Sequence, residues 1–367
     1  MPGWPRSRGN AFLSALSVRS GGERVGVSWL RGVVGRVSGV DVIFPPRLRR
    51  GSHLRVIAPA RSRALILEND HSEIAERRLH ELGFTVSYGA HVDERDRYDS
   101  SPVESRLADF HDAFADPQVD GVLTVIGGFN SNELLPGLAY GLIAANPKVL
   151  CGYSDITALQ NAILAKSGLV TYSGPHWASF GMRELFDDTR GWFTAALMDS
   201  APIQLRASSW FTDDLWFQNQ DERTQYPTGG WWRLQPGTAE GRIIGGNLCT
   251  LNLLQGTEYM PSLDGALLFV EDDERSNPVE FRRDLVSLLQ LPGAAGVTGL
   301  AIGRFQRASQ VGHRDLADLI ARLPALRGKP VLGNVDFGHT NPQVTFPIGG
   351  RARMMVGGDA TLNITQH

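Results

Sequence analysis

The segment KVLCGYSDIT, residues 148–157, contains the pattern that decides the fold. Its apolar run, residues 149–151, predicts a short buried strand, which Gly152 ends. A helix is expected from about Asp155 to Lys166, so Ser154 should lie on a tight turn with its hydroxyl exposed. A strand that passes through a short turn into a helix is the building unit of a parallel α/β sheet.

The residues on either side of this segment repeat the unit. Strands are predicted at 54–59, 84–88 and 121–126, and helices at 72–82, 103–115 and 133–139. The alternation indicates a parallel sheet with helices on both faces, in which functional groups gather at the C-terminal ends of the strands. A second unit begins past Gly241, with strands near 265–270, 299–305 and 330–333 and a helix near 279–291.

Between the two units the alternation stops. Residues 190–238 hold several prolines together with Trp192, Trp210, Trp216, Trp231 and Trp232. Because disordered linkers are poor in aromatic residues, we expect this stretch to be an ordered inter-domain connection.

The composition is that of a globular protein. The 367 residues include 42% hydrophobic and 20% charged side chains, which excludes a mostly disordered chain, a collagen-like fibre and a disulfide scaffold. The longest apolar runs fall far short of the roughly 18 residues of a membrane helix, so no membrane partner is expected. The chain has only two cysteines, Cys151 and Cys249, which favours a reducing compartment, and we expect the cytoplasm.

The net charge of −3 conceals an asymmetry. Residues 1–50 hold nine arginines against Glu23 and Asp41, a net charge of +7, and the remainder therefore carries −10. A basic head of this kind suggests an arm that binds nucleic acid or a membrane, a targeting segment, or sequence outside the fold.

Two strand ends carry residues suited to catalysis. Ser154 would have backbone N–H groups and a helix N-terminus beside it, which can stabilise an oxyanion. On this motif alone, however, a plain N-cap is the favoured interpretation of the serine. The loop 127–132, GGFNSN, also follows a strand, and its glycines let a ligand approach the backbone closely. A plain turn is about as probable, since the loop matches neither dinucleotide nor P-loop patterns.

Two further residues complete a possible triad. Glu271 directly follows the apolar run 267–270, and His339 lies among turn residues after a predicted strand. The chain order Ser, Glu, His, with each residue at a strand end, suits nucleophilic acyl transfer. No His-Glu-x-x-His or Cys-x-x-Cys spacing occurs, so neither a metal site nor a cofactor is expected.

The combination of motifs resembles the LD-carboxypeptidase family of serine peptidases, and within it the microcin C self-immunity branch. The motifs are the loop 127–132 with LLP at 134–136, GYSDITAL at 152–159, TYSGPH at 171–176, GRIIGGNL at 241–248, LFVED at 268–272 and FGHT at 337–340. The resemblance covers roughly residues 43–365. It implies a flavodoxin-like N-terminal domain at 43–190, a connection at 191–238, a β-rich α/β C-terminal domain at 239–367 and a homodimer.

The same resemblance assigns roles to residues. It makes Ser154 the nucleophile, His339 the general base and Glu271 the partner that orients the histidine. The backbone N–H groups of Gly128 and Asp155 would form the oxyanion hole. Residues 1–42 lie outside the family-like region, so we expect them to be a flexible extension or to precede the true start. They are poor evidence for nucleic-acid binding.

The resemblance allows two classes of substrate, one for each of two branches of the family. Housekeeping members cleave murein tetrapeptides during cell-wall recycling, and the immunity branch cleaves the amide that links a peptide or amino acid to a modified nucleotide. The triplet NSN at 130–132 favours the second branch, with Phe129 and Asn130 at the substrate and Trp177 as the best candidate to stack on a base. For most of the tryptophans we expect a packing role. A conjugate-binding protein without catalysis is the competing function.

Overall fold

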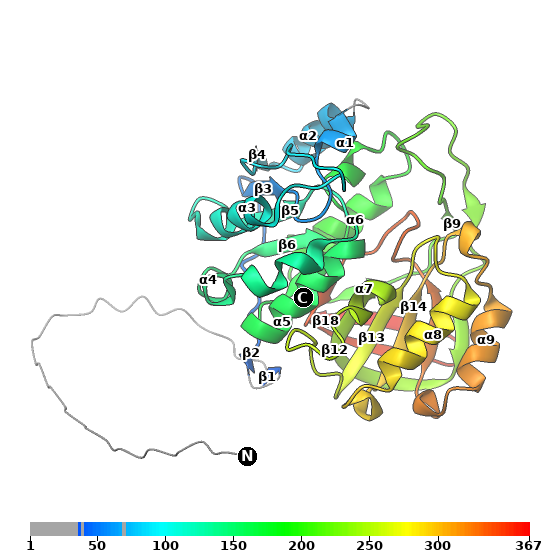
Figure 1. The fold of residues 1–367 in the computed structure, drawn as a ribbon. Coiled ribbons are helices and arrows are strands. Elements are labelled where there is room, and N and C mark those ends of the chain that lie inside the picture. Colours follow the sequence, from blue (N-terminus) through cyan, green and yellow to red (C-terminus); the bar gives the residue numbers. More distant parts are fainter. Residues whose placement is uncertain (1–35, 38–39, 68–70) are drawn as a thin grey trace, which may run out of the picture. The chain divides into compact units, whose positions relative to one another are not determined.

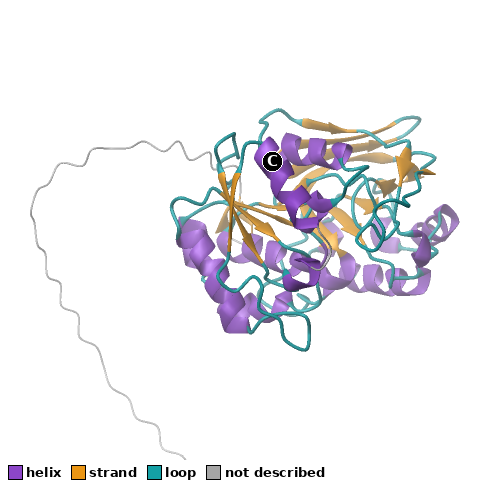
Figure 2. Ribbon diagram, turned by 90° about the horizontal axis from the view of Figure 1, so that it is seen from above, coloured by secondary structure: helices purple, strands orange, loops and turns teal. Residues whose placement is uncertain are grey.

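The computed structural model describes residues 36–37, 40–67 and 71–367 (Figure 1). The expected extension, residues 1–42, therefore lies mostly outside the described residues. Its described part includes a short antiparallel pair, β1 (Arg36–Val37) and β2 (Val40–Asp41). Most of the other strands belong to two large sheets, which appear as separate groups of strands with helices beside each (Figure 2).

The first sheet has six strands in the order β16-β7-β6-β5-β3-β4. The strands are β3 (His53–Ile57), β4 (Thr85–Tyr88), β5 (Gly121–Thr124), β6 (Val149–Gly152), β7 (Thr171–Ser173) and β16 (Phe346–Ile348). All pair in parallel except β16, which is antiparallel to β7. Taken in chain order, the five parallel strands are arranged 2-1-3-4-5, which is the flavodoxin-like arrangement. The predicted parallel sheet is confirmed.

The helices around this sheet are α1 (Ala64–Leu67), α2 (His71–Glu81), α3 (Val103–Ala115), α4 (Tyr140–Ala145), α5 (Thr157–Ser167) and α6 (Asp187–Leu197). The helix predicted at 133–139 is wrong. That stretch is a 3-10 helix, Ser131–Gly137, followed by α4. Pro136 inside it has no N–H to donate to an α-helical hydrogen bond, which explains the difference.

The second sheet has eight strands in the order β11-β15-β14-β13-β12-β17-β18-β8. The strands are β8 (Ile203–Leu205), β11 (Trp232–Gln235), β12 (Gly237–Asn247), β13 (Ala266–Glu271), β14 (Gly299–Gly303), β15 (Val331–Val335), β17 (Arg351–Val356) and β18 (Ala360–Gln366). The run from β12 to β15 is parallel and the outer pairs are antiparallel. The expected β-rich C-terminal unit is confirmed.

Three helices accompany the second sheet: α7 (Leu248–Asn252), α8 (Pro278–Leu289) and α9 (His313–Ala321). The stretch 191–238 contains β8, β11 and a separate antiparallel pair, β9 (Trp210–Phe211) and β10 (Tyr226–Pro227). It therefore contributes two strands to the second sheet. In the same way β16, late in the chain, joins the first sheet.

Helix α5 links the two sheets. Every residue of α5 except Lys166 is buried, because the helix packs against β7 and β16 of the first sheet and β12 of the second. Asn161 of α5 donates a hydrogen bond to the carbonyl oxygen of Gly245 on β12, at 2.8 Å. The turn that begins this helix is thereby held against the second sheet.

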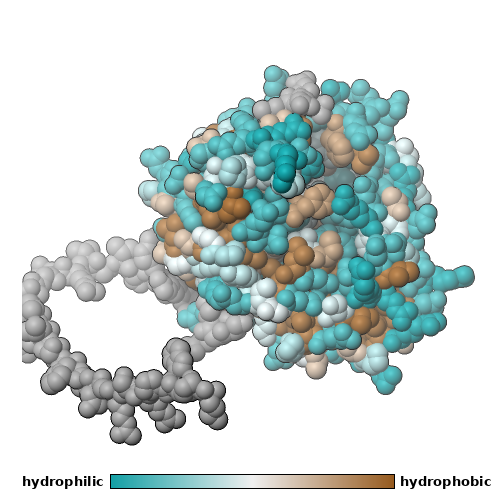
Figure 3. Space-filling model, viewed as in Figure 1, coloured by the Kyte–Doolittle hydropathy of each residue, from teal (hydrophilic) through white to brown (hydrophobic). Residues whose placement is uncertain are grey.

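The surface is mostly hydrophilic on the face shown in Figure 3, with scattered apolar patches. Among the described residues, the exposed large apolar side chains are Tyr98, Phe129, Leu215, Phe217, Leu253, Val279 and Met355. None of the helices in the described ranges is both long and apolar enough to cross a membrane.

Candidate active site

Ser154 lies on the turn between β6 and α5, in a short 3-10 helix, Ser154–Ile156. Its φ of +61° is in the left-handed region, which a non-glycine residue adopts only when its surroundings hold it there. The N-cap of α5 is Ile156, and the Ser154 hydroxyl instead meets a histidine. The N-cap interpretation of Ser154 is therefore wrong.

The structure brings Ser154, His339 and Glu271 into one chain of contacts. Ser154 Oγ lies 3.0 Å from His339 Nε2, and His339 Nδ1 lies 2.7 Å from Glu271 Oε2. Glu271 is the last residue of β13, and His339 is in the loop after β15. A proton on Nδ1, donated to the carboxylate, leaves Nε2 free to accept the serine proton.

Opposing effects act on the His339 imidazole. Burial lowers its pKa, because the charged form is poorly solvated, but the adjacent Glu271 carboxylate raises it. The carboxylate prevails, and the pKa of His339 lies above its ordinary value. The side chain is 16% exposed, so it remains within reach of a ligand.

The glycine-rich loop packs directly on the serine turn. A Cβ on Gly127 would lie 3.1 Å from Ser154 Oγ, and a Cβ on Gly128 would lie 2.9 Å from the Arg61 side chain. Both positions therefore favour glycine. Among the described residues, the N–H of Gly128 has no backbone partner, as an oxyanion-hole donor requires.

The side chain of Asp155 fixes this loop, a role that the sequence did not reveal. Its Oδ2 accepts hydrogen bonds from the backbone N–H groups of Asn130 and Ser131, at 3.1 and 2.9 Å. Ser131 Oγ in turn donates to the Asp155 carbonyl oxygen at 2.6 Å. The Asp155 N–H lies in the first turn of the 3-10 helix, where backbone N–H groups lack partners within the helix.

The three residues that were expected to contact the substrate differ in their exposure to solvent. Phe129 is 64% exposed, with the Arg275 guanidinium 4.6 Å from its ring centre, and Asn130 is half-buried beside it. Trp177 is wrong as a stacking residue, because it is completely buried and packs edge-on against Tyr88. Its place after a proline-containing motif gave no sign of this burial.

A buried group behind the serine was also missed. The His176 ring stacks on Tyr153 with ring centres 4.3 Å apart, and its Nδ1 lies 2.8 Å from Thr124 Oγ1. Burial, assisted by the charge of His339, lowers the pKa of His176 to about 3. His176 therefore stays neutral while Tyr153 contacts His339 edge-on at 5.2 Å.

A second missed group adjoins the glutamate. Asp272 is 1% exposed and accepts a hydrogen bond from Asn247 at 3.2 Å. Burial, together with the charges of Glu271 and Asp273, raises the pKa of Asp272 to about 7. Asp272 thus holds a proton more readily than an ordinary aspartate does.

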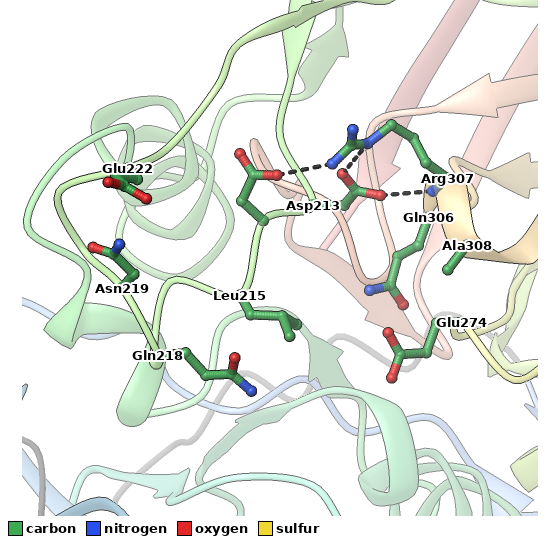
Figure 4. Close-up of a pocket in the computed structure, with 10 residues that line it drawn as sticks. Asp213, Leu215, Gln218, Asn219, Glu222, Glu274, Gln306, Arg307 and Ala308 are labelled. Carbon is green, nitrogen blue, oxygen red and sulfur yellow. Dashed lines mark hydrogen bonds and ion pairs between the residues drawn. The ribbon is translucent and has the colours of Figure 1, made fainter.

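Two cavities share part of their lining, and one of them opens beside His339. The inner chamber, of about 130 Å³, is lined by His339, Tyr153, Thr340, Trp216 and Arg223 among others. The outer chamber, of about 500 Å³, shares Asp213, Asp214, Leu215 and Gln306 with it. In Figure 4, Asp213 contacts Arg307 on one side of the outer chamber, and Glu274 and Glu222 face it from different segments. In the described part of the chain, no cluster of three or more His, Cys, Asp or Glu side chains could hold a metal ion.

A serine–histidine–glutamate contact between a flavodoxin-like sheet and a β-rich sheet defines a class of serine peptidases. Residues 54–174 match the LD-carboxypeptidase N-terminal domain, and residues 240–354 match the LD-carboxypeptidase C-terminal domain. The chain belongs to the LD-carboxypeptidase family.

Several individual members of this family are similar to the chain. The protein is 45% identical to YocD of Bacillus subtilis over 326 residues, 89% of this chain and all of YocD. A crystal structure of an MccF-like protein from Bacillus anthracis superposes with a TM-score of 0.87 and 43% identity, covering 89% of this chain and 100% of the other. The murein tetrapeptide carboxypeptidase of Pseudomonas aeruginosa is 29% identical over 299 residues, 80% of this chain and 90% of that enzyme.

MccF, the microcin C7 self-immunity protein of Escherichia coli, is also similar. It is 34% identical over 282 residues, 74% of this chain and 81% of MccF. A structure of MccF in complex with aspartyl sulfamoyl adenosine superposes with a TM-score of 0.78 and 29% identity, covering 89% of this chain and 99% of MccF.

Proposed function

We propose that this protein is a serine amidase that cleaves the amide bond between a small peptide or amino acid and a nucleotide-like group. The observation that carries the proposal is the unbroken contact from Ser154 Oγ through the His339 imidazole to the Glu271 carboxylate. The likeness to MccF, which binds aspartyl sulfamoyl adenosine, supports the substrate class.

The proposed reaction follows from this geometry. As Ser154 Oγ attacks the amide carbon, His339 Nε2 accepts the hydroxyl proton, and Glu271 stabilises the imidazolium that forms. The backbone N–H groups of Gly128 and Asp155 would donate to the oxygen that becomes negative. The imidazolium then gives its proton to the leaving nitrogen as the C–N bond breaks. Water releases the acyl group from Ser154 by the same proton transfers in reverse.

The side chains around the chambers suit a partly planar conjugate. Leu215 and Phe217 are 40% and 47% exposed and line the inner chamber. Trp216 lies between them in the chain and lines the same chamber. Aromatic faces of this kind stack on planar rings, which is the role we had expected of Trp177.

Cleavage of murein tetrapeptides is the second candidate. The likeness to the Pseudomonas aeruginosa murein tetrapeptide carboxypeptidase favours it. The test is to measure kcat/KM side by side for aspartyl sulfamoyl adenosine and a murein tetrapeptide. A ratio of about a hundredfold or more in favour of the conjugate is expected. A comparable preference for the tetrapeptide would reject the detoxification proposal and support the murein one.

The variant Ser154→Ala distinguishes an enzyme from a protein that only binds the conjugate. We expect turnover to fall to background while the Kd for the substrate is retained, because the chambers stay intact. Ser167→Ala is a matched control, since the Ser167 hydroxyl is buried in α5 and donates only within that helix. Turnover by Ser154→Ala at the wild-type rate would exclude the triad, and no turnover by the wild-type protein would support a binding protein.

We also propose that the protein acts as a homodimer in the cytoplasm. The resemblance to the family supports the dimer, and light scattering on a sizing column would test it. The two unpaired cysteines, Cys151 and Cys249, support a reducing compartment, which cell fractionation would test. The division into domains at 43–190 and 239–367, joined by 191–238, is likewise proposed, and limited proteolysis would test it.

A further inference from the structure

Thr340, the residue after His339, has a hydroxyl that the fold does not use. Thr340 lines the inner chamber and is 4% exposed. Among the described residues its Oγ1 has no hydrogen-bond partner. A buried hydroxyl without a partner destabilises a protein, because it has lost its hydrogen bonds to water.

Several polar side chains near Thr340 have hydrogen-bond partners of their own. His339 contacts Ser154 and Glu271, as described above. Thr189 Oγ1 donates to Asn341 Oδ1 at 2.7 Å, and Gln343 Nε2 donates to the Gly338 carbonyl oxygen at 3.0 Å. Most polar side chains of this loop therefore serve the triad or the loop itself. Within the described residues, the hydroxyls of Thr340 and Thr345 in this loop have no hydrogen-bond partner, and of these two only Thr340 lines the inner chamber.

The backbone around Thr340 is held in place. Asn341 and Thr212 exchange two backbone hydrogen bonds, of 2.8 and 2.9 Å, across an isolated antiparallel bridge. On the other side, Gly338 packs so closely on Glu271 that a Cβ would lie 2.7 Å from its Oε2. The loop is therefore anchored on both sides of Thr340.

A second donor without a partner lines the same chamber. Arg223 Nε is inaccessible to solvent and has no partner among the described residues, while its Nη1 donates to the Glu184 carbonyl oxygen at 2.7 Å. The nearby carboxylates of Asp213 and Asp214 accept from Arg307 at 2.6 and 2.8 Å, and in the part of the chain that the structure describes neither accepts from Thr340 Oγ1 or Arg223 Nε. Since Nε–H can only donate, the group that complements this chamber is an acceptor oxygen.

Thr340 Oγ1 itself has almost no surface open to solvent. We propose that, when the substrate enters the inner chamber beside His339, the Thr340 side chain turns about its Cα–Cβ bond and its hydroxyl donates a hydrogen bond to a carboxylate or carbonyl oxygen of the substrate. This inference deepens the proposed function and rests on it, because it assumes that the substrate occupies the chamber next to the triad. Thr340 would fix the substrate relative to Ser154 and would discriminate against ligands that lack the acceptor oxygen.

Thr340→Val tests this proposal, because valine keeps the shape of threonine and removes only the hydroxyl. We expect KM to rise about tenfold with kcat nearly unchanged, since one hydrogen bond to the bound substrate is lost. The Tm should stay equal or rise, because an unsatisfied buried group has been removed. Thr340→Ser, which keeps the hydroxyl, should restore KM.

Thr171→Val is the matched control. Thr171 of β7 is also fully buried with an unpartnered hydroxyl, but it lines neither chamber. We expect the same effect on Tm and none on KM. An unchanged KM in Thr340→Val, or an equal rise in Thr171→Val, would overturn the proposal. The proposal would also be overturned if Thr340→Val and Thr340→Ser both failed to fold.

Binding measured without turnover separates this proposal from the proposed function. Titration calorimetry would compare Ser154→Ala with Ser154→Ala/Thr340→Val, using aspartyl sulfamoyl adenosine and a murein tetrapeptide as probes. A Kd weakened about tenfold supports the Thr340 contact and shows which probe supplies the oxygen. An equal Kd for both proteins with both probes rejects the contact, even if Ser154 is the nucleophile. Conversely, turnover by Ser154→Ala would reject the nucleophile without touching the binding result.

Discussion

Replacement of Glu271 by glutamine removes the charge that orients His339 and leaves the size of the side chain unchanged. Glu271 is 3% exposed, and Gly338 closely approaches its carboxylate, so a glutamine should occupy the same space. Its amide group, however, can turn an N–H toward His339 Nδ1. A donor at that position favours the tautomer that carries its proton on Nε2, and this tautomer cannot accept the proton of Ser154.

The size of the effect follows from what the carboxylate does. Glu271 Oε2 lies 2.7 Å from Nδ1. In the proposed reaction it both selects the tautomer and stabilises the imidazolium in the transition state. Loss of both roles in a histidine–carboxylate pair lowers kcat by about 10³–10⁴-fold, or about 4–5.5 kcal/mol of transition-state stabilisation. KM should change little, because Glu271 is buried behind the histidine and lines neither chamber.

The pH profile supplies an independent readout for the same variant. In Glu271→Gln, burial still lowers the pKa of His339, but the charge that opposes burial has gone. The acid limb of kcat/KM should therefore move to lower pH. Glu240→Gln, on an exposed part of β12, is the control and should behave as wild type. Near-normal kcat in Glu271→Gln, or an acid limb that does not move, would refute the assignment of Glu271 as the orienting group.

Three further predictions test other parts of the site. In the wild-type protein, kcat/KM should reach half its maximum above pH 6.5, because the pKa of His339 is raised and the protonated imidazole cannot act as a base. A midpoint below pH 6 in a pH–rate profile would contradict this. Gly127→Ala should lower kcat by about tenfold to a hundredfold without unfolding the protein, since the new Cβ lies 3.0 Å from Ser154 Cβ and must displace the nucleophile; steady-state kinetics would check it. Trp231→Phe should lower the free energy of unfolding by about 2 kcal/mol in urea titrations, because Trp231 Nε1 donates at 2.8 Å to the buried carboxylate of Asp336.

The sequence predicted the elements whose patterns are local. The helix at 103–115 agrees at both ends with α3, and the strand–turn–helix at 148–157 agrees with β6 and α5. The central strand β12 and the outer strands β8, β11, β17 and β18 of the second sheet were missed. In β17 the exposed Met355 obscures the polar–apolar alternation, and β12 contains four glycines, which are poor strand formers. β16 has only three residues and is defined by a partner, β7, that lies far away in the chain.

The site divides in the same way between local and long-range information. Ser154 was a candidate from local information, because an apolar strand, a glycine and a helix start surround it, but this motif alone favoured an N-cap and only the combined motifs favoured a nucleophile. The strand ends suggested Glu271 and His339, but the pairing depends on two segments 68 residues apart. The stacking role predicted for Trp177 was wrong because burial depends on what packs over a side chain. Tyr88, which packs on Trp177, is far from it in the sequence, so the motif around Trp177 does not predict this contact. The role of the Asp155 side chain was not predicted for the same reason, because the loop that it holds follows a different strand.

The segment 212–231, which lines both chambers, also contacts the loop that carries His339, so the proposed function would link substrate binding to catalysis. Thr212 pairs with Asn341 two residues after His339, and Trp231 holds Asp336 three residues before it. Asp336 is further fixed by a buried ion pair with Arg304 at 2.7 Å. A ligand that moved the 212–231 segment would therefore shift the loop that carries His339, and would alter its 3.0 Å contact with Ser154. Substitutions in this segment should for that reason change kcat and KM together, whereas Thr340→Val should change KM alone.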